Sequence, residues 1–164
     1  MATKNKLYIL KIALYGRRGT WRRIAILDIQ SLSDLHDAIF DAFDRYDEHL
    51  YTFYVTDQPE FKLKPQNAYH NAKKYSHPDA ISHDGFAALF PSSAQKDATL
   101  TTISSLHLFK GQMFLYLFDF GDDWWHEITV EEITTKIPLD RRYPALIAKR
   151  GKSPEQYDEI DDDE

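Results

Sequence analysis

Carboxylates and an imidazole gather in residues 119–127, the densest polar cluster of the chain. Three aspartates and one histidine fall within eight residues there, on both sides of a predicted turn. Oxygen and nitrogen donors of this kind bind divalent cations. Asp119 and His126 would face each other at the mouth of a hairpin, and His49 could approach from a neighbouring strand. The sequence therefore predicts a metal site with the ligands Asp119, Asp122, His126 and His49.

A metal site here would make the protein a metal-dependent, hydrolase-like enzyme, with Glu127 or Asp123 as its base. The same residue types also have a purely architectural explanation. Aspartates cap turns by accepting hydrogen bonds from backbone amides, and a histidine on an apolar strand face is usually a hydrogen-bonded core residue. The spacing matches no standard metal motif, so both interpretations stay open and the only cofactor indicated is a divalent metal.

A second candidate site is basic and lies near the N-terminus. Seven lysines and arginines precede the first acidic residue, Asp28. Guanidinium groups contact phosphates, and arginine and aromatic side chains stack on bases. The predicted binding residues are Arg17, Arg18, Trp21, Arg22 and Arg23. Charged residues are also ordinary at a hairpin tip, which is the competing explanation.

The distribution of charge argues against a dedicated nucleic-acid-binding domain. The formal net charge is −6, but residues 155–164 hold 7 of the 26 acids, which leaves 19 acids against 20 basic residues in the rest of the chain. The body is thus nearly neutral rather than strongly basic. Residues 1–150 are expected to form one domain, and residues 151–164 an acidic, mobile tail.

Composition excludes several classes of protein. The 164 residues include no cysteine, so thiol catalysis, disulfides and thiolate metal sites are ruled out. No apolar run approaches the ~20 residues of a membrane span. The six glycines fit neither a phosphate loop nor a dinucleotide fingerprint. We expect a soluble, cytoplasmic protein with no membrane partner.

The elements that must position these residues begin with a hairpin and a helix. Apolar alternation predicts strands over residues 7–14 and 21–27, joined by a glycine turn. Ser31 followed by Asp34 is typical of a helix start, and apolar residues then recur at spacings of three and four. This pattern predicts an amphipathic helix over residues 33–46.

The remaining elements are strands separated by less regular segments. Strands are predicted over residues 49–55, 113–120 and 124–130, with extended pieces over 60–63 and 136–144 and a short helix at 100–106. The strand at 113–120 has no polar alternation before Asp119, which indicates burial on both faces. Residues 65–98 are assigned to a loop with one helical turn near 86–90, and their histidines, His70, His77 and His83, to a solvated surface.

These elements together predict an α+β fold. The expected architecture is a mostly antiparallel sheet of about five or six strands with one main amphipathic helix packed on it.

Four separated segments also resemble a known family. They are Trp21-Arg22-Arg23, residues 32–36, residues 49–53 and, most specifically, the Asp-Phe-Gly-Asp-x-Trp-x-His core that begins at Asp119. Over residues 7–144 the chain resembles the plasmid pRiA ORF-three-like family, whose members are also labelled insertion-element passenger TnpR proteins. The resemblance implies a compact α+β domain that is often encoded near mobile elements and has no established activity. If these segments converge in the fold, their residues form one polar and aromatic site.

The TnpR label would mean a resolvase, but the residues do not support that chemistry. A serine recombinase needs a nucleophilic serine on an early strand, and residues 7–27 contain none. The leading hypothesis is a non-enzymatic interaction domain with protein, mobile-element or nucleic-acid partners. The metal-dependent enzyme is the alternative, and a third possibility places the function in residues 65–98.

Overall fold

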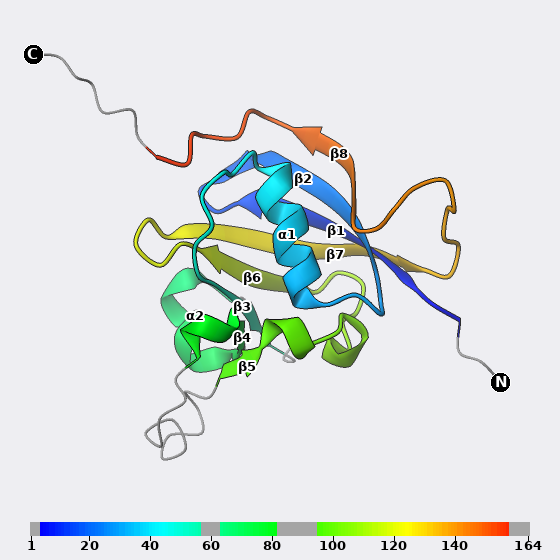
Figure 1. Cartoon of the computed structure of the whole chain (residues 1–164), viewed down its shortest axis with the longest axis horizontal. Coiled ribbons are helices and arrows are strands. Elements are labelled where there is room, and N and C mark those ends of the chain that lie inside the picture. Colours follow the sequence, from blue (N-terminus) through cyan, green and yellow to red (C-terminus); the bar gives the residue numbers. More distant parts are fainter. Residues whose placement is uncertain (1–3, 57–62, 82–94, 158–164) are drawn as a thin grey trace, which may run out of the picture.

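The computed structural model describes residues 4–56, 63–81 and 95–157, and within them eight strands form one sheet (Figure 1). The strands are β1 (Leu7–Leu14), β2 (Arg17–Leu27), β3 (Tyr51–Val55), β4 (Lys73–Ser76), β5 (Gln95–Asp97), β6 (Met113–Phe118), β7 (Trp124–Thr134) and β8 (Ala145–Arg150). Their order is β5-β4-β3-β6-β7-β1-β2-β8. All neighbours are antiparallel except β4 and β5, which are parallel.

The mixed α+β class is confirmed, and both predicted hairpins are present. β1 pairs with β2 from Leu7 opposite Leu27, and β6 pairs with β7 up to Phe118 opposite Trp124. The sheet has more strands than the five or six expected. β4 and β5 fall in the segment assigned to a loop, and the predicted extended piece at 136–144 is irregular, whereas the following residues form β8.

Two helices and three short 3-10 turns complete the described part of the chain. The second helix, α2 (Pro65–Asn71), also lies in the segment predicted to be a loop. The short helix predicted at 100–106 is replaced by the turns η3 (Ala98–Leu100) and η4 (Ser104–Leu106), and η1 (Pro78–Ala80) follows β4. The predictions for residues 60–62 and 86–90 lie outside the described residues. No helix in the described ranges is long and apolar enough to cross a bilayer.

The main helix, α1 (Leu32–Ala42), starts where its sequence predicts. The Ser31 hydroxyl accepts a hydrogen bond from the Asp34 amide at 3.1 Å, and the Asp34 carboxylate accepts one from the Ser31 amide at 2.9 Å. This capping box satisfies amides that the first turn leaves without a partner. The helix ends at Ala42, four residues before the predicted end, because Asp44 adopts a left-handed backbone with φ of 56° that a helix cannot continue.

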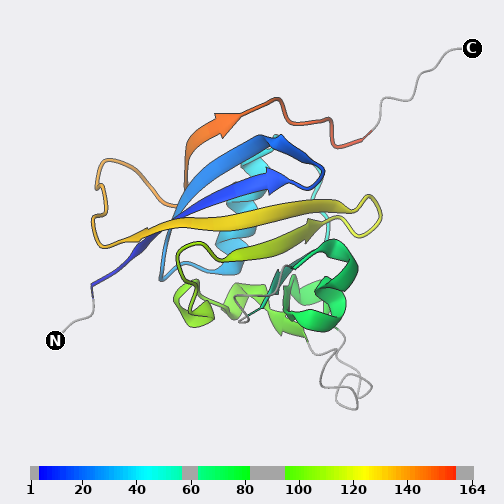
Figure 2. The ribbon, with the colours of Figure 1, turned by 180° about the vertical axis from the view of Figure 1, so that it is seen from behind.

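The core lies between α1 and one face of the sheet (Figure 1). Alternating residues of β1, such as Leu10 and Ile12, point to this side together with Leu35 and Ile39 of the helix. β6 is buried on both faces, as predicted. Its Leu115 and Leu117 belong to a smaller apolar cluster on the opposite face, which α2 covers. Figure 2 shows that the strands from β7 to β8 have no helix on that opposite face.

The chain beyond β8 is attached to the body of the domain as far as Tyr157. Ser153 and Gln156 are 8% and 3% exposed, and both form hydrogen bonds with the segment that follows α1. Residues 151–157 of the predicted tail are therefore held, and residues 158–164 lie outside the described part. The division of the chain at residue 150 stays a prediction.

Arg22 connects three parts of the fold. Its side chain is 2% exposed; Nε donates to the Ala42 carbonyl at 2.7 Å, and Nη1 donates to the carbonyls of Arg150 and Gly151, both at 3.0 Å. The end of α1, strand β2 and the end of β8 are thus joined through one guanidinium. Hydrogen bonds from a charged donor to buried carbonyls are among the stronger ones in a protein.

Replacing this guanidinium should destabilise the fold. We expect Arg22→Met to lower the free energy of unfolding by roughly 3 kcal/mol, because one buried and two partly buried hydrogen bonds of a charged donor are lost. Urea unfolding followed by tryptophan fluorescence measures the change. Arg17→Met removes the same charge from an exposed position and should change stability by less than about 0.5 kcal/mol. Equal losses in the two variants would contradict a structural role for Arg22.

Candidate functional site

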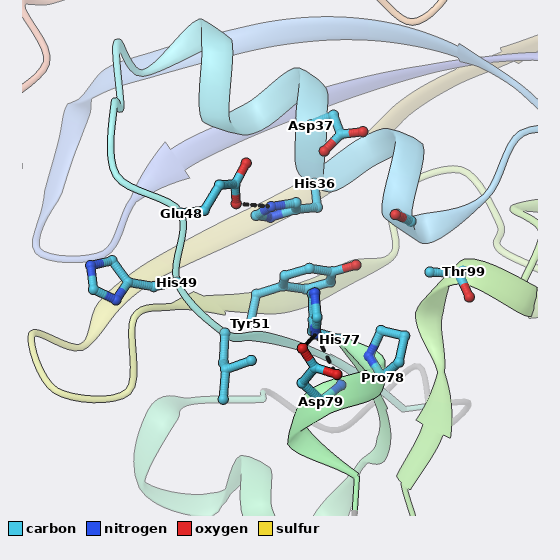
Figure 3. A pocket seen from close by; sticks show the side chains of 11 residues that line it. His36, Asp37, Glu48, His49, Tyr51, His77, Pro78, Asp79 and Thr99 are labelled. Carbon is cyan, nitrogen blue, oxygen red and sulfur yellow. Dashed lines mark hydrogen bonds and ion pairs between the residues drawn. The ribbon is translucent and has the colours of Figure 1, made fainter.

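A pocket of about 560 Å³ opens between α1, the segment that leads into β3, and η1 (Figure 3). Its described lining residues are Ser33, His36, Asp37, Glu48, His49, Leu50, Tyr51, His77, Pro78, Asp79 and Thr99. Three of these are histidines and three are acids, and none of the described lining residues is a lysine or an arginine. Polar groups that converge in a concave site are the usual mark of a binding site.

His36 forms the floor of this pocket. Its side chain is 4% exposed, its ring stacks on Tyr51 with centroids 3.9 Å apart, and Nδ1 lies 2.6 Å from the Tyr116 hydroxyl. On the open side, Nε2 lies 3.1 Å from Oε2 of Glu48. The ring thus connects the hydroxyl of a core tyrosine with a carboxylate that is 63% exposed.

The hydrogens in this chain of groups follow from the donors and acceptors. Burial lowers the pKa of His36 to about 4 and raises the pKa of Tyr116 well above its usual value, so both groups are neutral near pH 7. An ionised Glu48 can only accept, so Nε2 carries the imidazole hydrogen and Nδ1 accepts from the Tyr116 hydroxyl. Each of the two contacts of the His36 ring then contains one hydrogen, from the Tyr116 hydroxyl at Nδ1 and from Nε2 at Glu48.

Asp37 completes a group of three possible metal ligands. Donor atoms of His36, Asp37 and Glu48 all lie within 4.8 Å of one another. Ligand atoms around one ion with bonds near 2.1 Å lie at most about 4.2 Å apart, so this group has to move slightly closer together to hold one ion. Burial, together with neighbouring acids, raises the pKa of both Asp37 and Glu48. A bound cation would relieve that repulsion.

The four ligands predicted from the sequence do not form a single cluster. Nε2 of His49 lies 3.4 Å from Oδ2 of Asp119, so these two are brought together. The other carboxylate oxygen of Asp119 accepts from the amides of Gly121 and Asp122, at 3.0 Å and 3.3 Å, which is the turn-capping role that the sequence left open. The Asp122 side chain is exposed on the turn. Figure 3 shows the ring of His49 directed away from His36.

His126 lies in the core, 1% exposed. Nε2 is 3.4 Å from Nη2 of Arg45, and Nδ1 is 3.3 Å from the Tyr116 carbonyl. Burial and the Arg45 charge lower the pKa of His126 to about 3, so the ring is neutral. The guanidinium faces the lone pair that a metal would need. His126 therefore acts as a hydrogen-bonded core residue in this structure.

The predicted basic residues divide between the two faces of the sheet. Arg22 is buried on the side of α1, as described above. On the opposite face, Trp21 lies between Lys11 and Arg23, whose charged ends are 5.1 Å and 4.8 Å from its ring. Arg23 also pairs with Glu131 at 2.6 Å.

The hairpin tip keeps two exposed arginines. Arg17 is exposed, and Arg18, 78% exposed, lies 3.3 Å from Glu127. Of the five predicted binding residues, these two are the most accessible. Glu127, which the sequence offered as a base, is held by Arg18 on the face away from the pocket.

Apart from His49, which was a predicted ligand, sequence reasoning missed the residues that line the pocket. His36 stands four residues after Leu32, on the buried stripe of α1, and a polar residue in that stripe was the available signal. Glu48 and His77 lie in irregular segments whose position depends on the pairing of β3 with β4. His77, expected in a solvated loop, packs edge-on against Tyr51, with centroids 5.7 Å apart.

Acidification should destabilise the protein through His36. Its pKa is about 4 in the folded state and about 6.5 when unfolded, so between these values only the unfolded chain takes up the proton. The stability that this histidine contributes is present above pH 6.5 and falls by roughly 3 kcal/mol as the pH drops to 4. The lowered pKa of His126 also makes acid destabilise the folded state. The raised pKa values of Asp37 and Glu48 have the opposite effect on stability.

Two measurements check this expectation. Urea unfolding at several pH values should give a steeper loss below pH 6.5 for the natural chain than for His36→Asn. The ring protons of His36 should keep constant chemical shifts from pH 8 down to about 5. Titration of those shifts near pH 6.5 would contradict the buried, neutral histidine.

Comparison with known proteins adds the family. The chain matches the family described as plasmid pRiA4b ORF-3-like protein over residues 6–161. No curated protein matches it. A crystal structure of a protein of unknown function, MM3350 from Methanosarcina mazei Go1, is similar with a TM-score of 0.66 and 23% identity, covering 93% of this chain and 73% of that one. This likeness shows the fold alone, whereas the family match spans almost the whole sequence. The chain belongs to the plasmid pRiA4b ORF-3-like family.

Proposed function

We propose that the pocket binds a divalent transition-metal ion through His36, Asp37 and Glu48, and that the protein is a metal-dependent, hydrolase-like enzyme. The observation that carries this proposal is the convergence of three donor groups within 4.8 Å at the wall of a cavity of about 560 Å³. The sequence offered a metal-dependent enzyme as the alternative function. We keep that function and assign the metal site to different residues.

The donor set favours an ion of the zinc, cobalt or manganese type. Imidazole suits transition metals, and carboxylates suit these and harder ions. Nε2 of His36 becomes a ligand when the imidazole hydrogen moves to Nδ1, where the Tyr116 oxygen, 2.6 Å away, can accept it. A histidine ligand held through its second nitrogen is the common arrangement in metal sites.

Three protein ligands leave coordination positions open towards the cavity. An ion with an open position can polarise a substrate oxygen or lower the pKa of a bound water. The acidic lining supports a neutral or cationic polar substrate over a phosphorylated one, because carboxylates repel anions. His77 faces the same cavity, and its Nδ1 accepts from the Asp79 amide at 3.0 Å. A neutral His77 therefore carries its hydrogen on Nε2.

Metal binding is the direct test. Elemental analysis and titration with Co²⁺ or Zn²⁺ should give one equivalent for the natural chain. His36→Asn removes the imidazole nitrogen, and Glu48→Gln replaces a charged carboxylate by a neutral amide, so both variants should bind the metal far more weakly. Metal at one hundred times its dissociation constant should raise the free energy of unfolding by about 2.7 kcal/mol.

Two further variants make the result specific. Asp140→Asn removes an exposed carboxylate far from the pocket in sequence and serves as the control that keeps binding. Asp122→Asn decides between the pocket and the site predicted from the sequence, and it should also keep binding. Loss of metal in Asp122→Asn, or no metal in the natural chain, would overturn the pocket site.

A second candidate function is the non-enzymatic interaction domain. The exposed basic edge of the sheet favours it. Arg17 and Arg18 begin β2, and the neighbouring strand β8 ends in exposed Lys149 and Arg150, which lie opposite Arg22 and Trp21. Clustered cations of this kind suit an acidic partner such as nucleic acid.

Charge reversal tests this second candidate. Binding of a labelled single-stranded oligonucleotide should weaken steeply between about 50 and 200 mM salt, and further in the double variant Arg17→Glu plus Arg18→Glu. Fluorescence anisotropy measures it. The variant Lys73→Glu plus Lys110→Glu changes the net charge equally, away from this edge, and should bind as the natural chain does. Equal binding by both double variants would show that Arg17 and Arg18 do not contact the oligonucleotide.

A further inference from the structure

The segment after β8 reaches back to the pocket. Residues 152–157, called the C-terminal strap below, lie against the irregular segment 43–50, which connects α1 to β3 and carries Glu48 and His49. Figure 1 shows the chain running from β8 towards this side of the molecule. The sequence had placed these residues in an acidic tail.

Gln156 makes the most extensive contact of the strap. Its Oε1 accepts from the amides of Tyr46 and Asp47 at 3.0 Å and 3.1 Å, and its Nε2 donates to the Asp47 carbonyl at 2.8 Å. One side chain, 3% exposed, thus satisfies three backbone groups. These groups belong to no helix or strand, so they depend on Gln156 for their hydrogen bonds.

Tyr157 holds the other side of Glu48. Its hydroxyl donates to Oδ2 of Asp47 at 3.0 Å and lies 2.6 Å from Nε2 of His49. Its ring also packs edge-on against His49 and Tyr46, with centroids 6.2 Å and 5.9 Å away. Both neighbours of Glu48 in the sequence are therefore fixed by the strap.

Glu48 itself has little else to fix its position. Its side chain is 63% exposed, and its contact with His36 is made across the open side of the pocket. The preceding Asp44 has a left-handed backbone, after which the chain runs without regular structure to β3. The direction of the Glu48 carboxylate therefore depends on how the backbone at residues 47 and 49 is held.

We infer that Gln156 and Tyr157 are positioning residues for the metal site. Gln156 holds the backbone that precedes Glu48, and Tyr157 holds the side chains of Asp47 and His49, so that the Glu48 carboxylate faces His36. This inference rests on the proposed metal function. It assigns a role in that site to the C-terminal strap. Outer contacts that orient a ligand typically change metal affinity by about 10–100-fold when removed.

Cobalt binding to the full chain tests the inference. Gln156→Ala should weaken Co²⁺ binding by about tenfold or more. It should also change the visible absorption of the bound ion, because a displaced Glu48 alters the coordination. Glu155→Ala alters the neighbouring exposed residue and should leave both readings unchanged. Tyr157→Phe removes only a hydroxyl and should give a smaller loss of affinity in the same direction. This variant keeps the test decisive if Gln156→Ala fails to fold.

Amide hydrogen exchange at residues 46–49 provides a second reading that needs no metal. It should be slow in the natural chain and faster in Gln156→Ala. If Gln156→Ala binds Co²⁺ as tightly as the natural chain and with the same spectrum, the positioning role is wrong and the metal site stands. If Gln156→Ala does not fold, the same result with Tyr157→Phe leads to the same conclusion. If the natural chain binds no Co²⁺, the proposed function fails, and the strap's role in a metal site fails with it.

Discussion

The hydrogen bond between His36 and Tyr116 joins the only long helix of the described chain to the middle of its sheet, and the pocket depends on it. The Tyr116 hydroxyl is buried on β6, where an unpaired polar group costs free energy, and Nδ1 of His36 lies 2.6 Å away. This contact agrees with the rotation of α1 that its buried apolar residues require. Leu35 and Ile39 then face the core, and Asp37, one residue further, necessarily faces the rim.

The Asp-Phe-Gly-Asp-x-Trp-x-His sequence, which best carries the family resemblance, lies next to the hydrogen bond between His36 and Tyr116, because the ring of its His126 packs against Tyr116. Asp119 caps the turn between β6 and β7 with its carboxylate. Trp124 presents its ring to the Arg45 guanidinium at 4.4 Å, and His126 lies 3.4 Å from the same group. Burial lowers the pKa of Arg45 to about 10, yet it remains a cation near pH 7. The motif surrounds a buried cation with rings and acceptors, an architectural task that needs these residue types without any metal.

The sequence predicts the parts of the fold that rest on local patterns. Alternation in β1 and in β7, and the box formed by Ser31 and Asp34, are properties of a few adjacent residues. β4 and β5 have four and three residues, and their pairing with each other brings together residues about twenty positions apart, so no local pattern marks them. The pocket is harder still, because α1, the segment before β3 and the turn after β4 meet only once the sheet has formed. The contacts of Gln156 could not be predicted for the same reason. The acidic composition of residues 151–164 does not reveal that Gln156 bonds the backbone of residues 46 and 47.

His36 and His126 both lie against Tyr116, and their different surroundings explain why we propose only His36 as a metal ligand. Burial keeps both rings neutral near pH 7. Nε2 of His126 faces the Arg45 guanidinium, so a metal ion would meet a positive charge and no route to solvent. Nε2 of His36 faces the Glu48 carboxylate at the edge of a cavity, where a cation would gain a second ligand while Nδ1 keeps its contact with the Tyr116 hydroxyl. Burial makes either imidazole a possible ligand, and the sign of the charge facing Nε2 selects His36.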